Sequence, residues 1–366
     1  MSRRAADRIA WACCVVGLLL LVGCHKKPLE YQPTPYDLQI PKHFPTLLNI
    51  PADNPMTVEG VALGKRLFHD TQLGGYQGSD MSRRLSCATC HDRQHGYDVG
   101  SDNPRLQEGR PCGANGPTRH NALPLCNLVF NLEGYLWNGA VSGEKNIEDI
   151  VLAAITAEDE LAADTAEVVA RIAADPEYRE MFRKAFGTEA VTMDRIQKAI
   201  AQYVRSLVSA NSRFDQYLRG ETQLTEQELR GYVLFTTEEG ADCFHCHGGA
   251  GTPLFTTNQF YNNALDATLA ADDDRYSVTG DPQDIGAYRA PTMRNIAVSG
   301  PYMHDGRFRT LDEVLEFYNS GLQYSEYVHP YMHKLPDGGA HLTPSDIAAL
   351  KAFLNTLTDE EFIQEN

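Results

Sequence analysis

Two copies of one five-residue pattern hold the residues with the clearest chemistry. They are CATCH at 87–91 and CFHCH at 243–247. In each, two thiols lie about one helical turn apart, the spacing needed to add to the two vinyl groups of one heme, and the adjacent histidine can bind its iron. A zinc site would need further ligands, and a thioredoxin-like site would need one pair in a βαβ unit. The sequence therefore predicts two c-type hemes. Their attachment residues are Cys87, Cys90, Cys243 and Cys246, and the axial histidines are His91 and His247.

The first residues of the chain have the layout of an export signal. Three arginines at positions 3, 4 and 8 precede an apolar run over residues 9–22, which ends just before Cys24. The small residues before this cysteine resemble a bacterial lipobox, in which the cysteine is lipidated and becomes the mature N-terminus. The alternative is an uncleaved anchor helix, for which the apolar run is short. We therefore expect residues 1–24 to be a signal peptide and lipobox, and the protein to be lipid-anchored on the periplasmic side of a bacterial membrane.

The composition excludes some classes of partner. The chain has 366 residues, of which 22% are charged and 42% hydrophobic, so it is long enough for about two domains and is not typical of disordered or fibrous proteins. Its formal net charge of −17 repels phosphate groups, which argues against a nucleic-acid partner. Cationic proteins and small neutral substrates fit this charge better.

Helical periodicity predominates after a proline-rich stretch at residues 25–45, which we interpret as a linker. Apolar residues at helical spacing predict helices over 167–186, 192–218 and 343–357, the last with Thr343 as its N-cap ahead of a proline. Signals for strands are weak. The fold is therefore expected to be mainly α, with long loops between the helices.

A weak internal repeat indicates how the two motifs are organised. Residues 64–68 (GKRLF) precede the first cysteine pair, and residues 231–235 (GYVLF) precede the second. Two similar units fused in tandem would produce this pattern, with a boundary near residues 212–222. We therefore predict two cytochrome c-like heme domains, an N-terminal domain over 46–215 and a C-terminal domain over 216–366.

Five cysteines remain outside the two motifs. Cys13 and Cys14 belong to the predicted signal peptide, and Cys24 is the predicted lipidation site. Cys112 and Cys126 could form a disulfide in an oxidising compartment, and two independent buried thiols are the alternative.

The sequence resembles the bacterial diheme cytochrome c peroxidases and their relative MauG. The resemblance extends over about residues 45–362 and includes both heme motifs. It is most specific in the second half, in a long stretch between residues 289 and 306. The matching segments are Gly64–Phe68, Asn121–Asn127, Leu136–Gly139, Arg289–Asn295 and Gly300–Gly306. Membership of this family implies an oxidoreductase that uses hydrogen peroxide.

In that family the N-terminal heme reacts with peroxide, and a glutamate on its open side transfers a proton between the two peroxide oxygens. The resemblance assigns this role to Glu160, with Glu158 as the alternative in the same acidic segment. Typical peroxidases carry a second, removable histidine on this heme, and Gln107 stands at that position here. We interpret His95 and His120 as surface or propionate-contacting residues. The N-terminal iron is therefore expected to be open.

The resemblance also assigns residues to the path between the hemes and to the second iron. Trp137 matches a tryptophan that carries electrons or radical character between the hemes, although a lone tryptophan usually belongs to the core. Tyr318 matches the second axial ligand of the C-terminal heme, where peroxidases have methionine and MauG has tyrosine; Met303 and Met332 are competing ligands. A thioether raises the reduction potential, whereas a tyrosine oxygen donates charge and favours higher oxidation states of iron.

The family holds one calcium ion between the hemes. By resemblance its protein ligands are the side chain of Asn121 and the carbonyl oxygens of Ser299 and Pro301, with waters completing the shell. Oxygen-only ligation suits calcium, although none of these residues signals a metal on its own.

Three functions are compatible with these features. The first is a peroxidase that reduces hydrogen peroxide with electrons from a small cytochrome c or cupredoxin, passed through the C-terminal heme. The second is a MauG-like enzyme that uses peroxide to oxidise residues of a partner protein, and Tyr318 favours it. The third is a non-catalytic diheme electron carrier, which would need neither Glu160 nor an open iron. We therefore predict a peroxide-dependent oxidoreductase of the cytochrome c peroxidase type.

Overall fold

The computed structural model describes residues 31–269 and 273–364. The chain from Pro33 onward forms one compact unit. The predicted signal peptide and the predicted lipidation site Cys24 lie outside the described residues. Among the helices of the two described ranges, none combines the length and the apolar character that crossing a bilayer requires.

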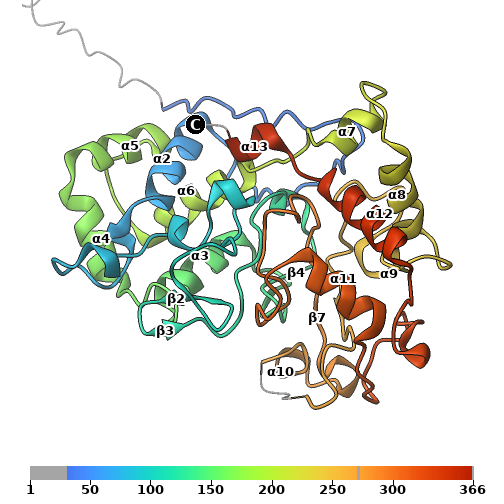
Figure 1. The fold of residues 1–366 in the computed structure, drawn as a ribbon. Coiled ribbons are helices and arrows are strands. Elements are labelled where there is room, and N and C mark those ends of the chain that lie inside the picture. Colours follow the sequence, from blue (N-terminus) through green and yellow to red (C-terminus); the bar gives the residue numbers. More distant parts are fainter. Residues whose placement is uncertain (1–30, 270–272, 365–366) are drawn as a thin grey trace, which may run out of the picture. The chain divides into compact units, whose positions relative to one another are not determined.

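The fold is mainly helical, as predicted, and long loops join the helices (Figure 1). Ser, Thr, Asn or Asp side chains cap the N-termini of most of the longer helices, which explains where these helices begin. The α-helices are α2 (Val58–Phe68), α3 (Ile147–Thr156), α4 (Thr165–Ala174), α5 (Pro176–Phe186), α6 (Met193–Ser206), α7 (Arg213–Leu218), α8 (Glu226–Thr236), α9 (Phe244–His247), α10 (Tyr276–Thr279), α11 (Leu311–Ser320), α12 (Pro344–Asn355) and α13 (Glu360–Gln364).

The strands are two to four residues long, in agreement with the weak strand signals of the sequence. They form one three-stranded antiparallel sheet, β1-β2-β3, and two antiparallel pairs, β4-β5 and β6-β7. The strands are β1 (Leu106–Gln107), β2 (Arg110–Gly113), β3 (Gly116–Pro117), β4 (Gly134–Tyr135), β5 (Val141–Ser142), β6 (Phe260–Tyr261) and β7 (Tyr288–Arg289).

Two of the predicted helices are interrupted. The helix predicted over 167–186 is α4 and α5, because Pro176 has no N–H to continue α4 and Asp175 caps the new helix by accepting from the N–H of Glu177. The helix predicted over 192–218 ends at Ser206 and resumes as α7. Between them, Ser209 exchanges two hydrogen bonds of 3.0 Å with the side chain of Asn127. The predicted N-cap Thr343 is confirmed.

Two large hydrophobic clusters form the interior. The first extends over residues 63–207 and joins α2 to α6. The second extends over residues 214–357 and includes side chains of α7, α8, α11 and α12. Cys87 packs against the first cluster and Cys243 against the second, so each heme motif lies at the border of one cluster.

The internal repeat of the sequence corresponds to a helix crossing that occurs twice. In the first half α2 crosses α6, and a Cβ atom at Gly64 would overlap the carbonyl oxygen of Ala199. In the second half α8 crosses α12, and a Cβ atom at Gly231 would overlap the carbonyl oxygen of Ala349. Glycine is needed at both positions because the backbones approach too closely for any side chain.

The phenylalanine that ends each repeat also has the same role in both halves. It lies four residues after the glycine and packs against an aromatic side chain four residues after the facing alanine. The ring centroids of Phe68 and Tyr203 are 5.2 Å apart, and those of Phe235 and Phe353 are 5.4 Å apart. The GxxxF repeat therefore encodes one helix crossing and one aromatic pair.

The chain returns to its first half at α13. The ring of Phe362 lies 5.6 Å from that of Tyr97, and a guanidinium nitrogen of Arg93 donates to the Phe362 carbonyl oxygen at 3.4 Å. The carboxylate of Asp359 accepts the N–H groups of Ala210 and Asn211, each at 2.8 Å. These contacts fix the C-terminal segment against the residues after the first heme motif and against the loop between α6 and α7.

Cys112 and Cys126 are separate thiols in the structure, so the possible disulfide is not formed. Cys112 donates to the side-chain oxygen of Gln107 at 3.3 Å. Cys126 is buried and accepts from the amide of Asn295 at 3.8 Å. The two cysteines therefore correspond to the alternative of independent thiols.

The helix crossing leads to a stability prediction. Replacing Gly64 with Ala adds about 1 kcal/mol of helix propensity, but it places a methyl group on a backbone carbonyl, and overpacking of this kind costs typically about 1–3 kcal/mol. We expect a net loss in the free energy of unfolding, measured by urea denaturation. The matched control is Gly251→Ala, because a Cβ atom there meets nothing within 4 Å. A Gly64→Ala protein as stable as the wild type would contradict the crossing.

Candidate active site

The first heme motif begins in a short 3₁₀ helix, Cys87–Thr89. The Nδ1 atom of His91 lies 2.9 Å from the carbonyl oxygen of Tyr97. A carbonyl oxygen only accepts, so Nδ1 carries the proton and Nε2 is left as a metal ligand. Burial lowers the pKa of His91 to about 4, which keeps the imidazole neutral. The local structure therefore fits an axial histidine.

The second motif repeats this arrangement at α9. The Nδ1 atom of His247 lies 3.2 Å from the carbonyl oxygen of Pro291, and burial lowers the pKa of His247 to about 4. A cavity of about 200 Å³ adjoins the motif and is lined by Cys243, Cys246 and His247 together with many apolar side chains. A preformed cavity beside a neutral imidazole and two thiols fits a covalently attached heme.

Glu160 lies beside the first motif. Burial raises the pKa of the Cys87 and Cys90 thiols to about 12, and the charge of Glu160 contributes to both shifts. Burial, followed by the nearby charge of Asp159, raises the pKa of Glu160 itself to about 7. Glu158, the alternative in the sequence, is exposed. Of the two carboxylates, the structure therefore brings Glu160 to the cysteine pair.

The backbone around Glu160 is held on both sides. The N–H of Ala114 donates to the carbonyl oxygen of Glu160, and the N–H of Gly75 donates to that of Leu161, both at 2.8 Å. A Cβ atom at Gly113 would overlap the carbonyl oxygen of Asp159. The loop after α3 is therefore fixed by backbone contacts that no local sequence pattern reveals.

Other protein groups contact the side chains of Gln107, His95 and His120. Gln107 is exposed and accepts from Cys112. Both ring nitrogens of His95 are engaged, Nδ1 with the carbonyl oxygen of Val298 at 2.8 Å and Nε2 with Asp102 at 3.0 Å. His120 has its Nε2 atom 3.5 Å from the carboxylate of Asp273. Each of these side chains is thus placed by a protein contact.

Trp137 is buried in the wall of the cavity at the second motif. Its Nε1–H donates to the carbonyl oxygen of Asn121 at 2.8 Å, and its ring lies 6.5 Å from that of His304. The His304 ring in turn stacks on Tyr288 with centroids 3.8 Å apart and an angle of 9°. Sequence reasoning gave no role to Tyr288 or His304, although His304 lies in a segment of strong resemblance and Tyr288 directly precedes another.

The three candidate ligands of the second iron, Tyr318, Met303 and Met332, all line the cavity with His247. The hydroxyl of Tyr318 accepts from the side-chain amide of Asn263 at 3.0 Å, and the same amide lies 3.7 Å from the Met303 sulfur. Burial raises the pKa of Tyr318. Asn263 was missed by sequence reasoning, because its role depends on a contact with a residue 55 positions away.

Two of the three predicted calcium ligands come together. The amide of Asn121 donates to the carbonyl oxygen of Pro301 at 2.6 Å, and Ser299 is buried two residues earlier. The Oδ1 atom of Asn121 is buried and has no hydrogen-bond partner within the described residues. An orphaned amide oxygen next to a carbonyl oxygen fits a hard cation such as calcium.

Comparison with known proteins identifies the family that this chain is similar to. A family model described as di-haem cytochrome c peroxidase matches residues 58–223. Cytochrome c551 peroxidase of Nitrosomonas europaea is 32% identical over 316 residues, which cover 85% of this chain and 84% of that protein. Methylamine utilization protein MauG of Methylophilus methylotrophus is 29% identical over 310 residues, which cover 83% of this chain and 85% of MauG.

Solved structures of diheme and MauG-like proteins have the same fold as this chain. A MauG-like protein associated with microbial copper homeostasis is 33% identical, with a TM-score of 0.78 over 90% of this chain and 97% of that one. The diheme peroxidase BthA from Burkholderia thailandensis shares the fold, with a TM-score of 0.69 at 23% identity over 85% of this chain and 88% of BthA.

The two motif sites and the mainly helical fold define a diheme c-type peroxidase. The chain belongs to the diheme cytochrome c peroxidase and MauG family. It is an oxidoreductase that uses hydrogen peroxide and two c-type hemes. Members of this family are periplasmic.

The position of Glu160 leads to a kinetic prediction. Glu160→Gln should keep both hemes and lose peroxide cleavage by roughly 10²–10⁴-fold, the usual contribution of a general acid–base group. The side chain is protonated below pH 7 and ionised above it, because its pKa is raised to about 7. The wild-type rate constant with peroxide should therefore rise with pH through about 7, and stopped-flow measurements should show no such rise in the variant.

Glu158→Gln is the matched control, because Glu158 is the exposed carboxylate two residues earlier. It should react with peroxide at the wild-type rate. The assignment of Glu160 is wrong if Glu158→Gln is the slow variant and Glu160→Gln is not.

Proposed function

We propose that hydrogen peroxide is cleaved at the N-terminal heme site and that Glu160 transfers the proton that the cleavage requires. The observation that supports this most is a partly buried carboxyl group with a pKa raised to about 7 near the first motif. When bound, the heme supplies the electrons that break the O–O bond. Ionised Glu160 accepts a proton from one peroxide oxygen and returns it to the other, which leaves as water. A pKa near neutrality suits both steps.

We propose Trp137 as the link between the two heme sites. Its indole lies in the wall of the second cavity, and its N–H donates to a backbone carbonyl oxygen. A fixed indole beside the stacked rings of His304 and Tyr288 supports a role in carrying electrons or radical character. The carbonyl oxygen of Asn121 holds the indole of Trp137. Asn121 also belongs to the proposed calcium site with Ser299 and Pro301.

At the second site we propose that Tyr318 would bind the heme iron as its second protein ligand together with His247, with Asn263 as a positioning residue. The hydroxyl of Tyr318 lies in the cavity and already accepts from the Asn263 amide. The same amide contacts the sulfur of Met303, so Met303 and Met332 stay as the competing ligands.

The source of the electrons distinguishes two candidate functions. In the first, a small cytochrome c or cupredoxin delivers electrons to the C-terminal heme, and peroxide is reduced to water. In the second, the oxidising equivalents are used on residues of a partner protein. A tyrosine hydroxyl inside the second cavity supports the second function, as does the similarity to a MauG-like protein associated with copper homeostasis. The first is supported by the several relatives named as peroxidases.

We further propose that the protein is held on the periplasmic side of the membrane by lipid at Cys24. We propose that the N-terminal and C-terminal heme domains extend over 46–215 and 216–366. The buried residues of the first hydrophobic cluster lie in the first range, and those of the second cluster lie in the second range except for Phe214.

Electron paramagnetic resonance of the ferric holoprotein tests the proposed function. We expect one high-spin and one low-spin heme, and a reaction with peroxide that needs no prior reduction. Steady-state peroxide turnover with reduced cytochrome c and reduced cupredoxin then separates the two candidate functions. Rapid turnover with either donor supports the peroxidase, whereas fast peroxide reaction without donor turnover supports oxidation of a partner protein. Two low-spin signals that ignore peroxide until an electron is added would contradict an open first site.

Tyr318→Phe should change the spectrum of the C-terminal heme only, because the variant removes the proposed ligand oxygen and little else. Tyr318→Met should raise the potential of that heme, since a thioether replaces a charge-donating oxygen. Redox titration followed by optical spectroscopy measures both effects. The control is Tyr324→Phe, at a tyrosine that is 73% exposed. A C-terminal heme spectrum unchanged in Tyr318→Phe would return the role to Met303 or Met332.

A further inference from the structure

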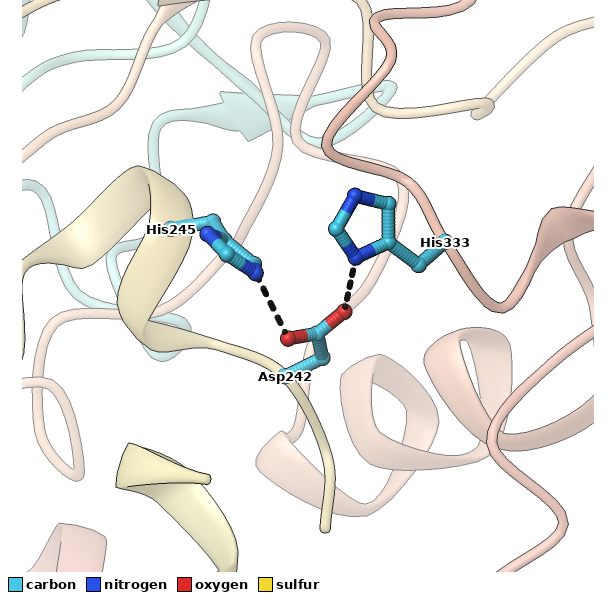
Figure 2. Close-up of side chains that lie close together, drawn as sticks. All are labelled: Asp242, His245 and His333. Atoms are coloured by element: carbon cyan, nitrogen blue, oxygen red, sulfur yellow. Dashed lines mark ion pairs between the residues drawn. The ribbon is translucent and has the colours of Figure 1, made fainter. Parts of the chain in front are cut away.

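One carboxylate and two imidazoles gather beside the second heme motif, outside the catalytic residues described above. Figure 2 shows the carboxylate of Asp242 between the rings of His245 and His333. Asp242 directly precedes Cys243, His245 lies between the two cysteines of the motif, and His333 comes from the loop after α11. The group therefore joins two segments that are about ninety residues apart in the sequence.

Two of the three distances within this group are close to those between ligands of one metal ion. The Nε2 atom of His245 lies 3.0 Å from one Asp242 oxygen, and the Nδ1 atom of His333 lies 3.4 Å from the other. All three ligand atoms lie within 4.8 Å of one another. Nitrogen and oxygen atoms bound to one tetrahedral ion at about 2.0–2.2 Å are roughly 3.3 Å apart. Small side-chain rotations would bring the three atoms onto one ion.

Burial supplies a second, independent observation. The Asp242 side chain is only 5% exposed, and neither of its oxygens has a hydrogen-bond partner within the described part of the chain. The Nε2 atom of His245 is likewise buried without a hydrogen bond. The same oxygens form ion pairs with His245 and His333 when those imidazoles are protonated, and a bound cation would take the place of these protons and compensate the buried carboxylate. The half-exposed His333, at 48%, leaves a path from solvent.

The neighbouring side chains favour a bound ion. A carboxylate oxygen of Glu238, which is mostly exposed, lies 4.0 Å from the same nitrogen of His245 and can complete the shell with water. The ring of Tyr331 stacks on His245 at 5.0 Å and fixes its plane. The ammonium of Lys334, whose charge opposes the binding of a cation, donates to the carbonyl oxygen of Glu238 at 2.6 Å.

We propose that Asp242, His245 and His333 bind one divalent transition-metal ion at the edge of the C-terminal heme site. Two imidazoles and a carboxylate suit zinc, copper and nickel, and an open site of this type binds Cu²⁺ most tightly. The bound ion would place positive charge beside the second heme and favour the reduced state of its iron. Metal binding itself does not depend on the proposed function, whereas the effect on the heme requires the heme at Cys243 and Cys246.

Equilibrium dialysis of the holoprotein against Zn²⁺ tests the proposal, with Cu²⁺ as the expected stronger competitor. We expect one Zn²⁺ per chain. His333→Asn should weaken binding at least about 10-fold, the lower end of the effect seen when even a supporting group of a metal site is lost. Asp242→Asn, which keeps the shape and removes the charge, should do the same. His341→Asn is the matched control, at an exposed histidine outside the group.

A redox titration supplies a second measurement. Zinc bound at an unrelated surface histidine would not change the heme potential that it records. Zn²⁺ should raise the potential of the C-terminal heme in the wild type and in His341→Asn, and should leave it unchanged in His333→Asn. The proposal is overturned if the wild type binds no Zn²⁺ in dialysis, if His333→Asn binds as tightly as the wild type, or if His341→Asn loses binding equally. None of these outcomes depends on peroxide activity, so failure here leaves the proposed function untouched.

Discussion

The first half of the molecule depends on one close approach between two helices. Because Gly64 has no side chain, α2 lies directly on the backbone of α6, and Phe68 at the end of α2 is carried into the interior. There its ring packs 6.0 Å from that of Tyr97. The carbonyl oxygen of Tyr97 is the group that holds the Nδ1 atom of His91. Helix packing thus supports the segment that orients His91, the predicted axial histidine.

The second half contains a similar series of contacts, formed by different residues. Gly231 lets α8 approach α12, and Phe235 packs 5.9 Å from Phe255. Burial lowers the pKa of His247, and the backbone near Pro291 and Phe255 partly offsets this effect. Both halves therefore share the step from glycine to phenylalanine to a second aromatic ring, and the five-residue similarity is its trace in the sequence.

Local chemistry could be predicted from the sequence, and long-range contacts could not. The heme motifs and the Thr343 cap are short patterns whose meaning depends only on neighbouring residues. The break before α5 was missed because helical periodicity continues across Pro176, which starts a new helix. The position of Glu160, the predicted catalytic carboxylate, depends on backbone bonds that Ala114 donates to it and that Gly75 donates to Leu161. Loop packing determines such contacts, and it produces no periodic pattern in the sequence.

The contact of α13 with the segment after the first heme motif also orders events during folding. Arg93 and Phe362 are 269 positions apart, so in a chain that emerges N-terminus first their contact can form only after nearly the whole polypeptide has emerged. Until then Tyr97, the support of His91, lacks its outer aromatic neighbour. The second motif is separated from its own packing partners in α12 by only about a hundred residues. The proposed cofactor attachment at Cys87 therefore has the longer window before the polypeptide closes over it.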